Sequence, residues 1–345
     1  MNAELEVLVE RSGGVGVITL NRPKAINALT LGMVRTITRV LTEWSADDGV
    51  KLALIRGAGE RGLCAGGDIR AIYDAMPSQD PAPLVFWREE YALNQQIAEY
   101  PEPIVAVMNG IVMGGGIGLS AHASHRIVTE TTGIAMPETG IGFVPDVGAS
   151  HLLSRSPGES GTHLALTAGR VAAADALFLR LADFHIETAR LANLPEILSD
   201  CRSSEEIETR LRILATPAER GFLASARSWI DPAYSADTVE EICARLRQSG
   251  EPQALEDLAK IRGNSPTSLE LALRALRHGR QFDSLARCLA MELTLASHLV
   301  RSHDMREGIR AAVIDKDRKP KWSPARLEDV SEADVEAYFS DADLR

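Results

Sequence analysis

The chain has 345 residues, of which 45% are hydrophobic and 25% are charged, and its formal net charge is −11. This length permits one large domain, or a domain with a sizeable extension, around a substantial core. The acidic balance argues against a nucleic-acid or anionic-membrane partner, because both bind to basic faces.

The first fourteen residues, MNAELEVLVERSGG, contain acids and no basic region ahead of an apolar run, so we expect no signal peptide. No apolar run approaches the length of a membrane span. The cysteines are far apart and near no histidine cluster, so we expect reduced thiols and no metal site. They are Cys64, Cys201, Cys243 and Cys288. Reduced thiols favour a cytoplasmic location.

Strands alternate with helices in the first half of the chain. LEVLVE and VGVITL, joined by RSGG, predict a β-hairpin. Apolar spacing predicts a helix that begins after a cap at Thr30 and ends near Trp44. A longer helix is expected from Leu84 to Glu99. The other predicted strands are KLALIRG, PIVAVMNG, HRIVTE and GIAM.

From about Leu191 the chain becomes helical, with acidic and basic residues mixed. Helices are predicted in SSEEIETRLRILA, TVEEICARLRQSG, QALEDLAKIRG, SLELALRALRHG and LARCLAMELTLASHLV. We therefore expect an α/β protein with a core of residues 1–190, which holds the active site, and a helical region of residues 191–345.

Two glycine-rich segments, Ala65–Asp68 and Gly114–Gly118, lie where a strand passes into a helix. Glycines there allow close backbone approach, and a helix start leaves N–H groups unpaired. Two facing loops of this kind would form an oxyanion hole. Neither fits a phosphate-binding P-loop, and the second only loosely matches a dinucleotide-binding motif. The alternative is that both are tight turns with close helix packing.

The stretch MPETGIGFVPDVGAS places two acids, Glu138 and Asp146, in an apolar loop where burial would be costly without partners. One could act as base or nucleophile while the other orients substrate. The alternative is that both are turn or capping residues, with Asp146 capping the next helix.

Three other residues, Glu89, Glu90 and Cys64, lie near these segments or beside aromatic residues and are further site candidates. Glu89 and Glu90 lie on a helix beside aromatic residues, where a solvated face is the simpler interpretation. Cys64 adjoins the first glycine-rich segment, but a nucleophilic thiol requires a positioned base, so a small buried residue is preferred.

Four segments resemble the crotonase, or enoyl-CoA hydratase/isomerase, superfamily in order and spacing: NRPKAINAL, CAGGDIRAIY, NGIVMGGGIGLSAHASHRI and MPETGIGFVPDVGA. More narrowly, FWREEYALN, NSPTSLELALRAL and MREGIRAAVIDKDRKPKW resemble the 3-hydroxyisobutyryl-CoA hydrolase family. The resemblance spans nearly the whole chain and is weakest over residues 195–260. It implies a crotonase (ClpP/crotonase-like) fold, a spiral of ββα units followed by a helical C-terminal region.

The resemblance also implies roles for individual residues. The N–H groups of Gly67 and Gly115 would form the oxyanion hole, and Glu138 would be the principal catalytic carboxylate. Asp146 would hold the substrate's 3-hydroxyl or assist the water, and Glu90 would contact the substrate. The CoA adenine would lie against Lys24, Ala25, Ala65 and Ile69. CoA is part of the substrate, so no separate cofactor and no metal is implied.

One position discriminates within the superfamily. Hydratases similar to this chain place a second glutamate where Gly118 stands here, because hydration requires one group to activate water and another to deliver a proton. We therefore expect hydrolysis of a short-chain 3-hydroxyacyl-CoA, most directly 3-hydroxyisobutyryl-CoA in valine catabolism.

The alternatives are an enoyl-CoA hydratase or isomerase, and a non-catalytic protein that binds acyl-CoA or a partner. A homo-oligomer is possible, since crotonases are often trimers or dimers of trimers. The helical C-terminal region could, however, cover the surface that such assemblies use.

Overall fold

The computed structural model describes residues 5–78 and 80–340. The chain forms two compact units, each assembled from three separate segments. The first comprises Met1–Gly67, Glu89–Ile134 and Val171–Gly221, and the second comprises Asp68–Arg88, Ala135–Arg170 and Phe222–Arg345. The division at residue 190 stays a prediction. The first four residues of the N-terminal segment and the last five of the C-terminal region lie outside the described residues.

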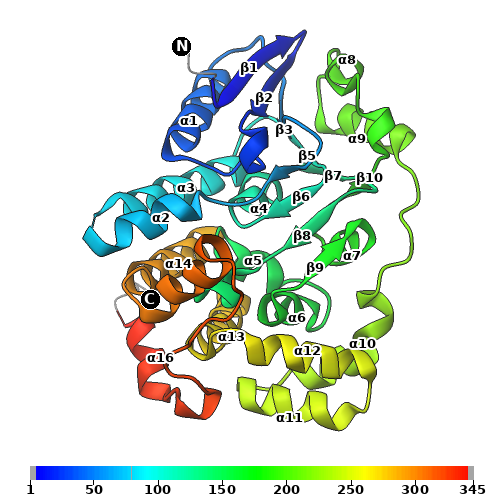
Figure 1. The fold of residues 1–345 in the computed structure, drawn as a ribbon. Coiled ribbons are helices and arrows are strands. Elements are labelled where there is room, and N and C mark those ends of the chain that lie inside the picture. Colours follow the sequence, from blue (N-terminus) through cyan, green and yellow to red (C-terminus); the bar gives the residue numbers. More distant parts are fainter. Residues whose placement is uncertain (1–4, 79, 341–345) are drawn as a thin grey trace. The chain divides into compact units, whose positions relative to one another are not determined.

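The strands form two sheets. The larger has the order β1-β2-β3-β5-β7-β10, and the smaller has the order β4-β6-β8-β9 (Figure 1). The strands are β1 (Val7–Ser12), β2 (Val15–Leu20), β3 (Leu52–Gly57), β4 (Gly62–Cys64), β5 (Ile104–Met108), β6 (Ile111–Met113), β7 (His125–Val128), β8 (Gly133–Ala135), β9 (Arg170–Ala172) and β10 (Phe184–His185).

In the larger sheet only β1 and β2 are antiparallel, and their register pairs Ser12 with Val15 across the predicted glycine turn. The other neighbours, β2–β3, β3–β5, β5–β7 and β7–β10, run parallel. Parallel strands require crossover connections, which explains why helices separate these strands in the sequence. The hairpin and the strand–helix alternation predicted from the sequence are therefore confirmed.

The interior strand β2 is buried along its whole length, because both of its faces are covered, whereas the edge strand β1 is largely exposed. On one face, the Trp44 ring of α1 (Leu31–Ser45) lies against Gly16, where a Cβ would come within 2.6 Å of the ring. On the other face, Val15 and Val17 pack in one cluster with Leu198 of α8 (Leu194–Leu198) and Leu211 of α9 (Ser204–Leu214). Figure 1 shows α1 and the α8–α9 pair on opposite sides of the sheet.

Helix α1 begins as the sequence predicts, because the Thr30 hydroxyl accepts a hydrogen bond of 3.1 Å from the Met33 N–H. Helix α3 (Ala82–Ala98) corresponds to the helix expected from Leu84. A short helix, α2 (Ile69–Ala75), follows the first glycine-rich segment, and another, α4 (Gly115–Ser120), begins within the second. Helix α7 (Ala173–Phe178) precedes β10.

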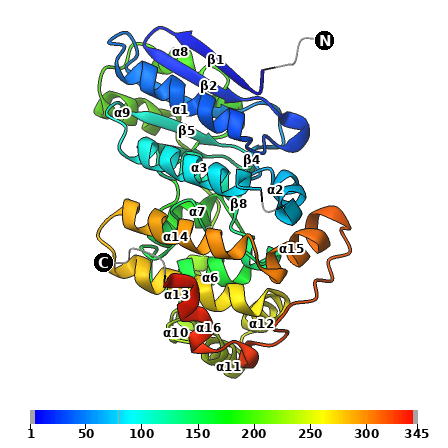
Figure 2. The ribbon, with the colours of Figure 1, turned by 90° about the vertical axis from the view of Figure 1, so that its left-hand side faces the viewer.

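The second unit is mostly helical, and α13 packs against α5, α6, α14 and α16. Figure 1 shows α10, α11 and α12 side by side, and Figure 2 shows α16 next to α13. The helices are α5 (Ala149–Leu153), α6 (Ser160–Thr167), α10 (Leu223–Tyr234), α11 (Val239–Ser249), α12 (Pro252–Gly263), α13 (Pro266–Gln281), α14 (Leu285–Leu299), α15 (His303–Ile309) and α16 (Glu332–Phe339), and α15 continues into a π-helix, η5 (Arg310–Ile314).

Candidate functional site

The two glycine-rich segments lie against each other in the first unit. Gly66 has a left-handed backbone (φ 101°), and a Cβ built on it would lie 3.8 Å from both the Gly114 Cα and the Gly115 N. The Gly66 carbonyl accepts a hydrogen bond of 2.8 Å from the Leu29 N–H, which fixes the loop immediately before Gly67. Gly115 is the first residue of α4, so its N–H has no partner within the helix. The structure thus brings the two proposed oxyanion-hole segments together.

Glu90 lies directly beside Gly115. A Cβ at position 115 would overlap the Glu90 Oε1 atom and come within 2.9 Å of the Leu29 Cδ1. Glu90 is only 2% exposed, so the simpler interpretation of a solvated helix face is wrong for it, and the substrate contact implied by the resemblance stays a prediction. Its neighbour Glu89 does form a surface ion pair, with Arg35 at 2.7 Å. The helix therefore separates the two acids, turning Glu90 toward the glycine-rich segments and Glu89 away.

The residues expected at the CoA adenine lie near the same loops. Lys24 and Ala25 form part of an exposed 3-10 turn, η1 (Pro23–Ala25), and the following Ile26 carbonyl accepts a hydrogen bond of 2.9 Å from the Ala65 N–H. Ile69 is the first residue of α2 and belongs to the second unit. In the first unit, the hydrogen bond between Ala65 and Ile26 therefore brings Ala65 close to Lys24 and Ala25.

Cys64 is a buried structural residue. Its side chain is 0% exposed, and burial raises the pKa of the Cys64 thiol to about 12, with the nearby Glu90 charge adding to the effect. The Sγ atom lies 3.3 Å from the Gly66 N, from which it accepts a hydrogen bond. A thiol with this pKa is no nucleophile at neutral pH, which agrees with the simpler interpretation.

Glu138 and Asp146 are both buried in the second unit, at 6% and 5% exposure. Glu138 begins a short 3-10 turn, η3 (Glu138–Ile141), whose N-cap is Pro137. The N-cap of α5 is Gly148, and the Asp146 carbonyl accepts a hydrogen bond of 2.8 Å from the Ala149 N–H. Both carboxylates therefore lie in one buried loop, and their catalytic roles stay predictions.

The C-terminal motifs that resemble the hydrolase family support the loop that carries Glu138. Asn264 donates to the Thr139 Oγ1 (3.2 Å) and to the Leu166 carbonyl (2.9 Å), and the Ser265 N–H donates to the Thr139 carbonyl at 3.0 Å. A Cβ on Gly308 would come within 2.6 Å of the Ile141 Cα. The helical region therefore has a defined task here: it fixes the backbone next to Glu138.

Sequence reasoning missed two further features of this loop. Phe143 stacks on Trp87 of α3, with ring centroids 5.2 Å apart and planes 14° from parallel. Glu292 of α14 accepts hydrogen bonds from the N–H groups of Gly148 (2.7 Å) and Ser150 (2.9 Å). FWREEYALN drew attention to the helix of Trp87, but nothing in the sequence links Glu292 to a loop more than 140 residues away.

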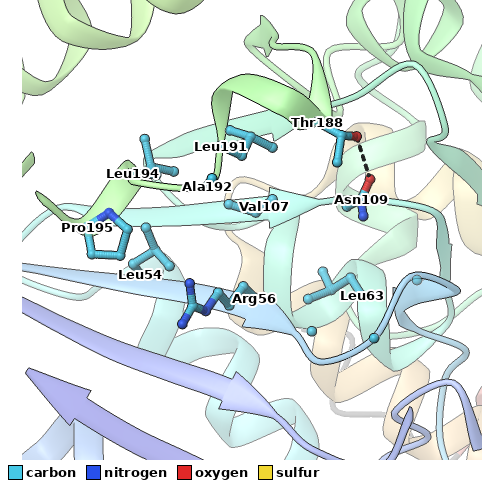
Figure 3. A pocket seen from close by; sticks show the side chains of 13 residues that line it. Leu54, Arg56, Leu63, Val107, Asn109, Thr188, Leu191, Ala192, Leu194 and Pro195 are labelled. Atoms are coloured by element: carbon cyan, nitrogen blue, oxygen red, sulfur yellow. Dashed lines mark hydrogen bonds between the residues drawn. The ribbon is translucent and has the colours of Figure 1, made fainter. Parts of the chain in front are cut away.

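A separate pocket of about 320 Å³ lies in the first unit (Figure 3). Its wall is largely apolar and includes Leu54, Val107 and Leu194, and Asn109 at its edge accepts a hydrogen bond of 3.3 Å from the Thr188 hydroxyl. The remaining lining residues are Arg56, Gly57, Gly59, Gly62, Leu63, Thr188, Leu191, Ala192 and Pro195. It contains none of the predicted catalytic or CoA-binding residues.

Within residues 5–78 and 80–340, no cluster of His, Cys, Asp or Glu side chains has the arrangement of a metal site. Nor does any helix in that part of the chain have the length and apolar character to cross a membrane. All four cysteines are free and buried. The candidate residues are divided between the units: Gly67, Gly115 and Glu90 belong to the first, and Glu138 and Asp146 to the second.

Comparison with known proteins places this arrangement in a family. The enoyl-CoA hydratase/isomerase family model matches residues 15–339. The chain belongs to this family. It is 42% identical over 348 residues to the "3-hydroxyisobutyryl-CoA hydrolase, mitochondrial" of Danio rerio, covering 99% of this chain and 91% of that protein. It is 43% identical to the human protein of the same name, covering 98% and 89% respectively.

A solved structure is similar over almost the whole chain. It is described as a carnitinyl-CoA dehydratase from Mycobacterium thermoresistibile, and it matches with a TM-score of 0.93 and 45% identity, covering 99% of this chain and 98% of that one. The crotonase fold expected from the sequence is therefore confirmed. The names of these relatives describe different reactions. The proteins from Danio rerio and human are named hydrolases, and the solved structure is named a dehydratase.

Proposed function

We propose that the chain hydrolyses the thioester of a short-chain 3-hydroxyacyl-CoA, most directly 3-hydroxyisobutyryl-CoA, to the free hydroxy acid and CoA. The observation that carries this proposal is the combination of a glycine at position 118 with a carboxylate at position 146. Gly118 is a buried glycine of α4, where similar hydratases have their second glutamate, and Asp146 is a buried carboxylate in the catalytic loop. The names of the relatives at 42% and 43% identity support the same activity.

Two routes are open for Glu138. In the first, its carboxylate oxygen attacks the thioester carbonyl carbon, the C–S bond breaks, and CoA leaves as a thiolate that takes up a proton. Water then opens the resulting anhydride and regenerates the Glu138 carboxylate. In the second, Glu138 accepts a proton from a water molecule that attacks the carbonyl carbon directly. Both routes pass through a tetrahedral oxyanion.

The oxyanion would accept hydrogen bonds from the Gly67 and Gly115 N–H groups. Fixed donors of this kind stabilise the transition state by an amount equivalent to a rate factor of about 10²–10³ each. Asp146 would bind the substrate 3-hydroxyl or orient the water, and Glu90, beside Gly115, would contact the acyl group. Lys24, Ala25, Ala65 and Ile69 would line the adenine region.

The decisive experiment is thiol release from 3-hydroxyisobutyryl-CoA, with crotonyl-CoA and 3-hydroxypropionyl-CoA alongside. We expect free CoA from the hydroxyacyl substrates and none from the Glu138→Ala variant. A pre-steady-state burst of CoA equal to the enzyme concentration would favour the anhydride route, because thiol leaves before water reacts.

The dehydratase name of the solved relative favours a second candidate, a hydratase or dehydratase. In that case crotonyl-CoA would lose its enoyl absorbance and gain the mass of one water, while CoA stays attached. A non-catalytic acyl-CoA binder would change neither substrate. The same acyl-CoA mixture, followed by mass spectrometry, therefore separates all three functions.

We also propose a role in valine catabolism and a cytoplasmic location. The named relatives are mitochondrial proteins, so the location is best tested by fractionation of the source cells. Deletion of the gene should prevent growth on valine and leave growth on acetate unchanged. Light scattering of the purified chain would establish whether the predicted homo-oligomer forms.

A further inference from the structure

The backbone that follows Asp146 has an unfavourable conformation. Val147 has φ 54° and Gly148 has φ 84°, both in the left-handed region. Glycine adopts this region freely, but a β-branched residue does so only at a cost, because its Cβ substituents crowd the backbone. Val147 is fully buried. Such a conformation persists only where surrounding contacts hold it.

Glu292 supplies those contacts. Its Oε2 accepts a hydrogen bond of 2.7 Å from the Gly148 N–H. Its Oε1 accepts one of 2.9 Å from the Ser150 N–H and one of 2.5 Å from the Ser150 hydroxyl. The side chain is 0% exposed, so these bonds form away from competing water. One carboxylate from α14 thus fixes the chain immediately after the strained residue.

We propose that Glu292 is a positioning residue: it holds the Asp146–Val147–Gly148 backbone in its strained conformation and thereby directs the Asp146 carboxylate. Glu292 acts through the backbone of Gly148 and through Ser150. The inference rests on the proposed function only in the assignment of Asp146 to the substrate.

The chemistry of the three donors explains why a carboxyl group stands at position 292. The two N–H groups can only donate, whereas the Ser150 hydroxyl can donate or accept. Burial raises the pKa of Glu292 to about 8, the three hydrogen bonds oppose this, and the Asp146 charge adds to it. The carboxyl group offers one oxygen to each N–H group, and its Oε1 also accepts from the Ser150 hydroxyl.

Glutamine has the same shape but cannot satisfy these partners. If the glutamine NH₂ group takes the place of Oε2, it faces the Gly148 N–H. If the NH₂ group takes the place of Oε1, it faces the Ser150 N–H. Either orientation sets two donors against each other, which leaves a buried N–H without an acceptor. Glu292→Gln is therefore a minimal change in volume that removes the anchor.

The test measures turnover of 3-hydroxyisobutyryl-CoA by Glu292→Gln, Asp146→Asn and the double variant. We expect Glu292→Gln to lower kcat about 10²-fold, the size of effect that a displacement of about 1 Å produces. In the double variant the loss should be no greater than in Asp146→Asn alone, because Glu292 acts through Asp146. Multiplicative losses, or a kcat within twofold of the parent enzyme, would overturn the proposal.

The matched control is Glu270→Gln. Glu270 of α13 is also a largely buried acid of the second unit, with a pKa raised to about 8 by burial and by Glu240, and it accepts a hydrogen bond from the Val239 N–H. We expect this variant to keep the parent kcat. Its loss of activity in step with Glu292→Gln would contradict a specific role for Glu292.

Amide hydrogen exchange over residues 147–150 gives a readout independent of activity. We expect faster exchange in Glu292→Gln and parent rates in Glu270→Gln. Unchanged exchange would refute the anchor even if turnover falls. If the parent enzyme releases no thiol, the proposed function fails, while faster exchange still supports the anchor. Should Glu292→Gln not fold, Ser150→Ala takes its place and must show the same non-additive loss with Asp146→Asn.

Discussion

In the first unit the groups expected to act on the substrate are backbone N–H groups, whereas in the second they are the side chains of Glu138 and Asp146. The glycine-rich segments leave no room for a side chain at Gly115, because a Cβ there would overlap Glu90. The carboxylate loop requires side chains that are costly to bury, and helices of its own unit support it. The glycine-rich segments therefore require the absence of side chains, and the loop of Glu138 and Asp146 requires hydrogen bonds from surrounding helices.

The sharpest test of the carboxylate loop is removal of its principal acid. Glu138→Gln keeps the volume but cannot attack a carbonyl or accept a proton, so we expect kcat for CoA release to fall about 10²–10⁴-fold. Glu89→Gln is the matched control, because Glu89 is a half-buried acid of the same helix as Glu90 and pairs with Arg35. Retention of activity by Glu138→Gln would assign the chemistry to another residue.

The glycine-rich region is tested by adding a single methyl group. Gly115→Ala should lower kcat about 10²–10³-fold, since the new Cβ overlaps Glu90 and displaces an oxyanion donor. Gly263→Ala has nothing within 4 Å of its Cβ and should keep its activity. Equal activity of the two variants would remove the distinction between the regions.

Anchoring of the carboxylate loop by the helical region predicts an intermediate effect. Asn264→Ala leaves the Leu166 carbonyl and the Thr139 hydroxyl without their donor. We expect a loss of about 1–3 kcal/mol in the free energy of unfolding and about a tenfold fall in kcat. An exposed-residue substitution such as Asn193→Ala serves as the control. A fall in stability without any change in kcat would show that the loop holds its geometry unaided.

The pKa of Glu292 predicts how stability changes with pH. Because burial raises it from 4.5 to about 8, the folded state binds one more proton than the unfolded state between these pH values. The free energy of unfolding should therefore fall as pH rises through this window, by at most about 1.4 kcal/mol per pH unit from this group. Urea unfolding of the parent and Glu292→Gln, measured from pH 4.5 to pH 8, should show a smaller slope in the variant. A parallel pair of curves would mean that Glu292 is ionised throughout.

The smallest effect is expected at Cys64, which belongs to the glycine-rich region without taking part in its chemistry. A thiol with a pKa of about 12 is neutral at pH 7, so Cys64→Ala should keep kcat within about twofold. The intact protein should also resist alkylation at this residue until it is unfolded, as peptide mass spectrometry would show. A larger loss of activity would give the thiol a role that its burial argues against.

Local features of the fold could be predicted from the sequence because their causes are local. The Thr30 cap, the hairpin at Ser12 and Val15, and the glycines before α2 and α4 depend on neighbouring residues. Burial of Glu90 could not be predicted, since which face of a helix is covered depends on the packing of distant segments. The role of Glu292 could not be predicted for the same reason, because its partners Gly148 and Ser150 are more than 140 residues away.

The assembly of separate chain segments into two compact units could not be predicted from the spacing of apolar residues either. A change in composition near Leu191 suggested a boundary, whereas each compact unit combines three separate stretches of chain. Similarity to family segments predicted the roles of Glu138, Asp146 and Gly118. The contacts of Asn264 and Gly308 then explain why motifs so far along the chain accompany those residues.

The distance between Gly148 and Glu292 along the chain has a consequence for biosynthesis. The two residues are 144 positions apart. A ribosome that adds about 5–20 residues per second reaches Glu292 roughly 7–30 s after it has added Gly148. During that interval the nascent chain has no carboxylate to hold Val147 in its left-handed conformation. The first unit is complete once residue 221 has emerged, but the loop that carries Asp146 stays without its anchor until Glu292 has been synthesised.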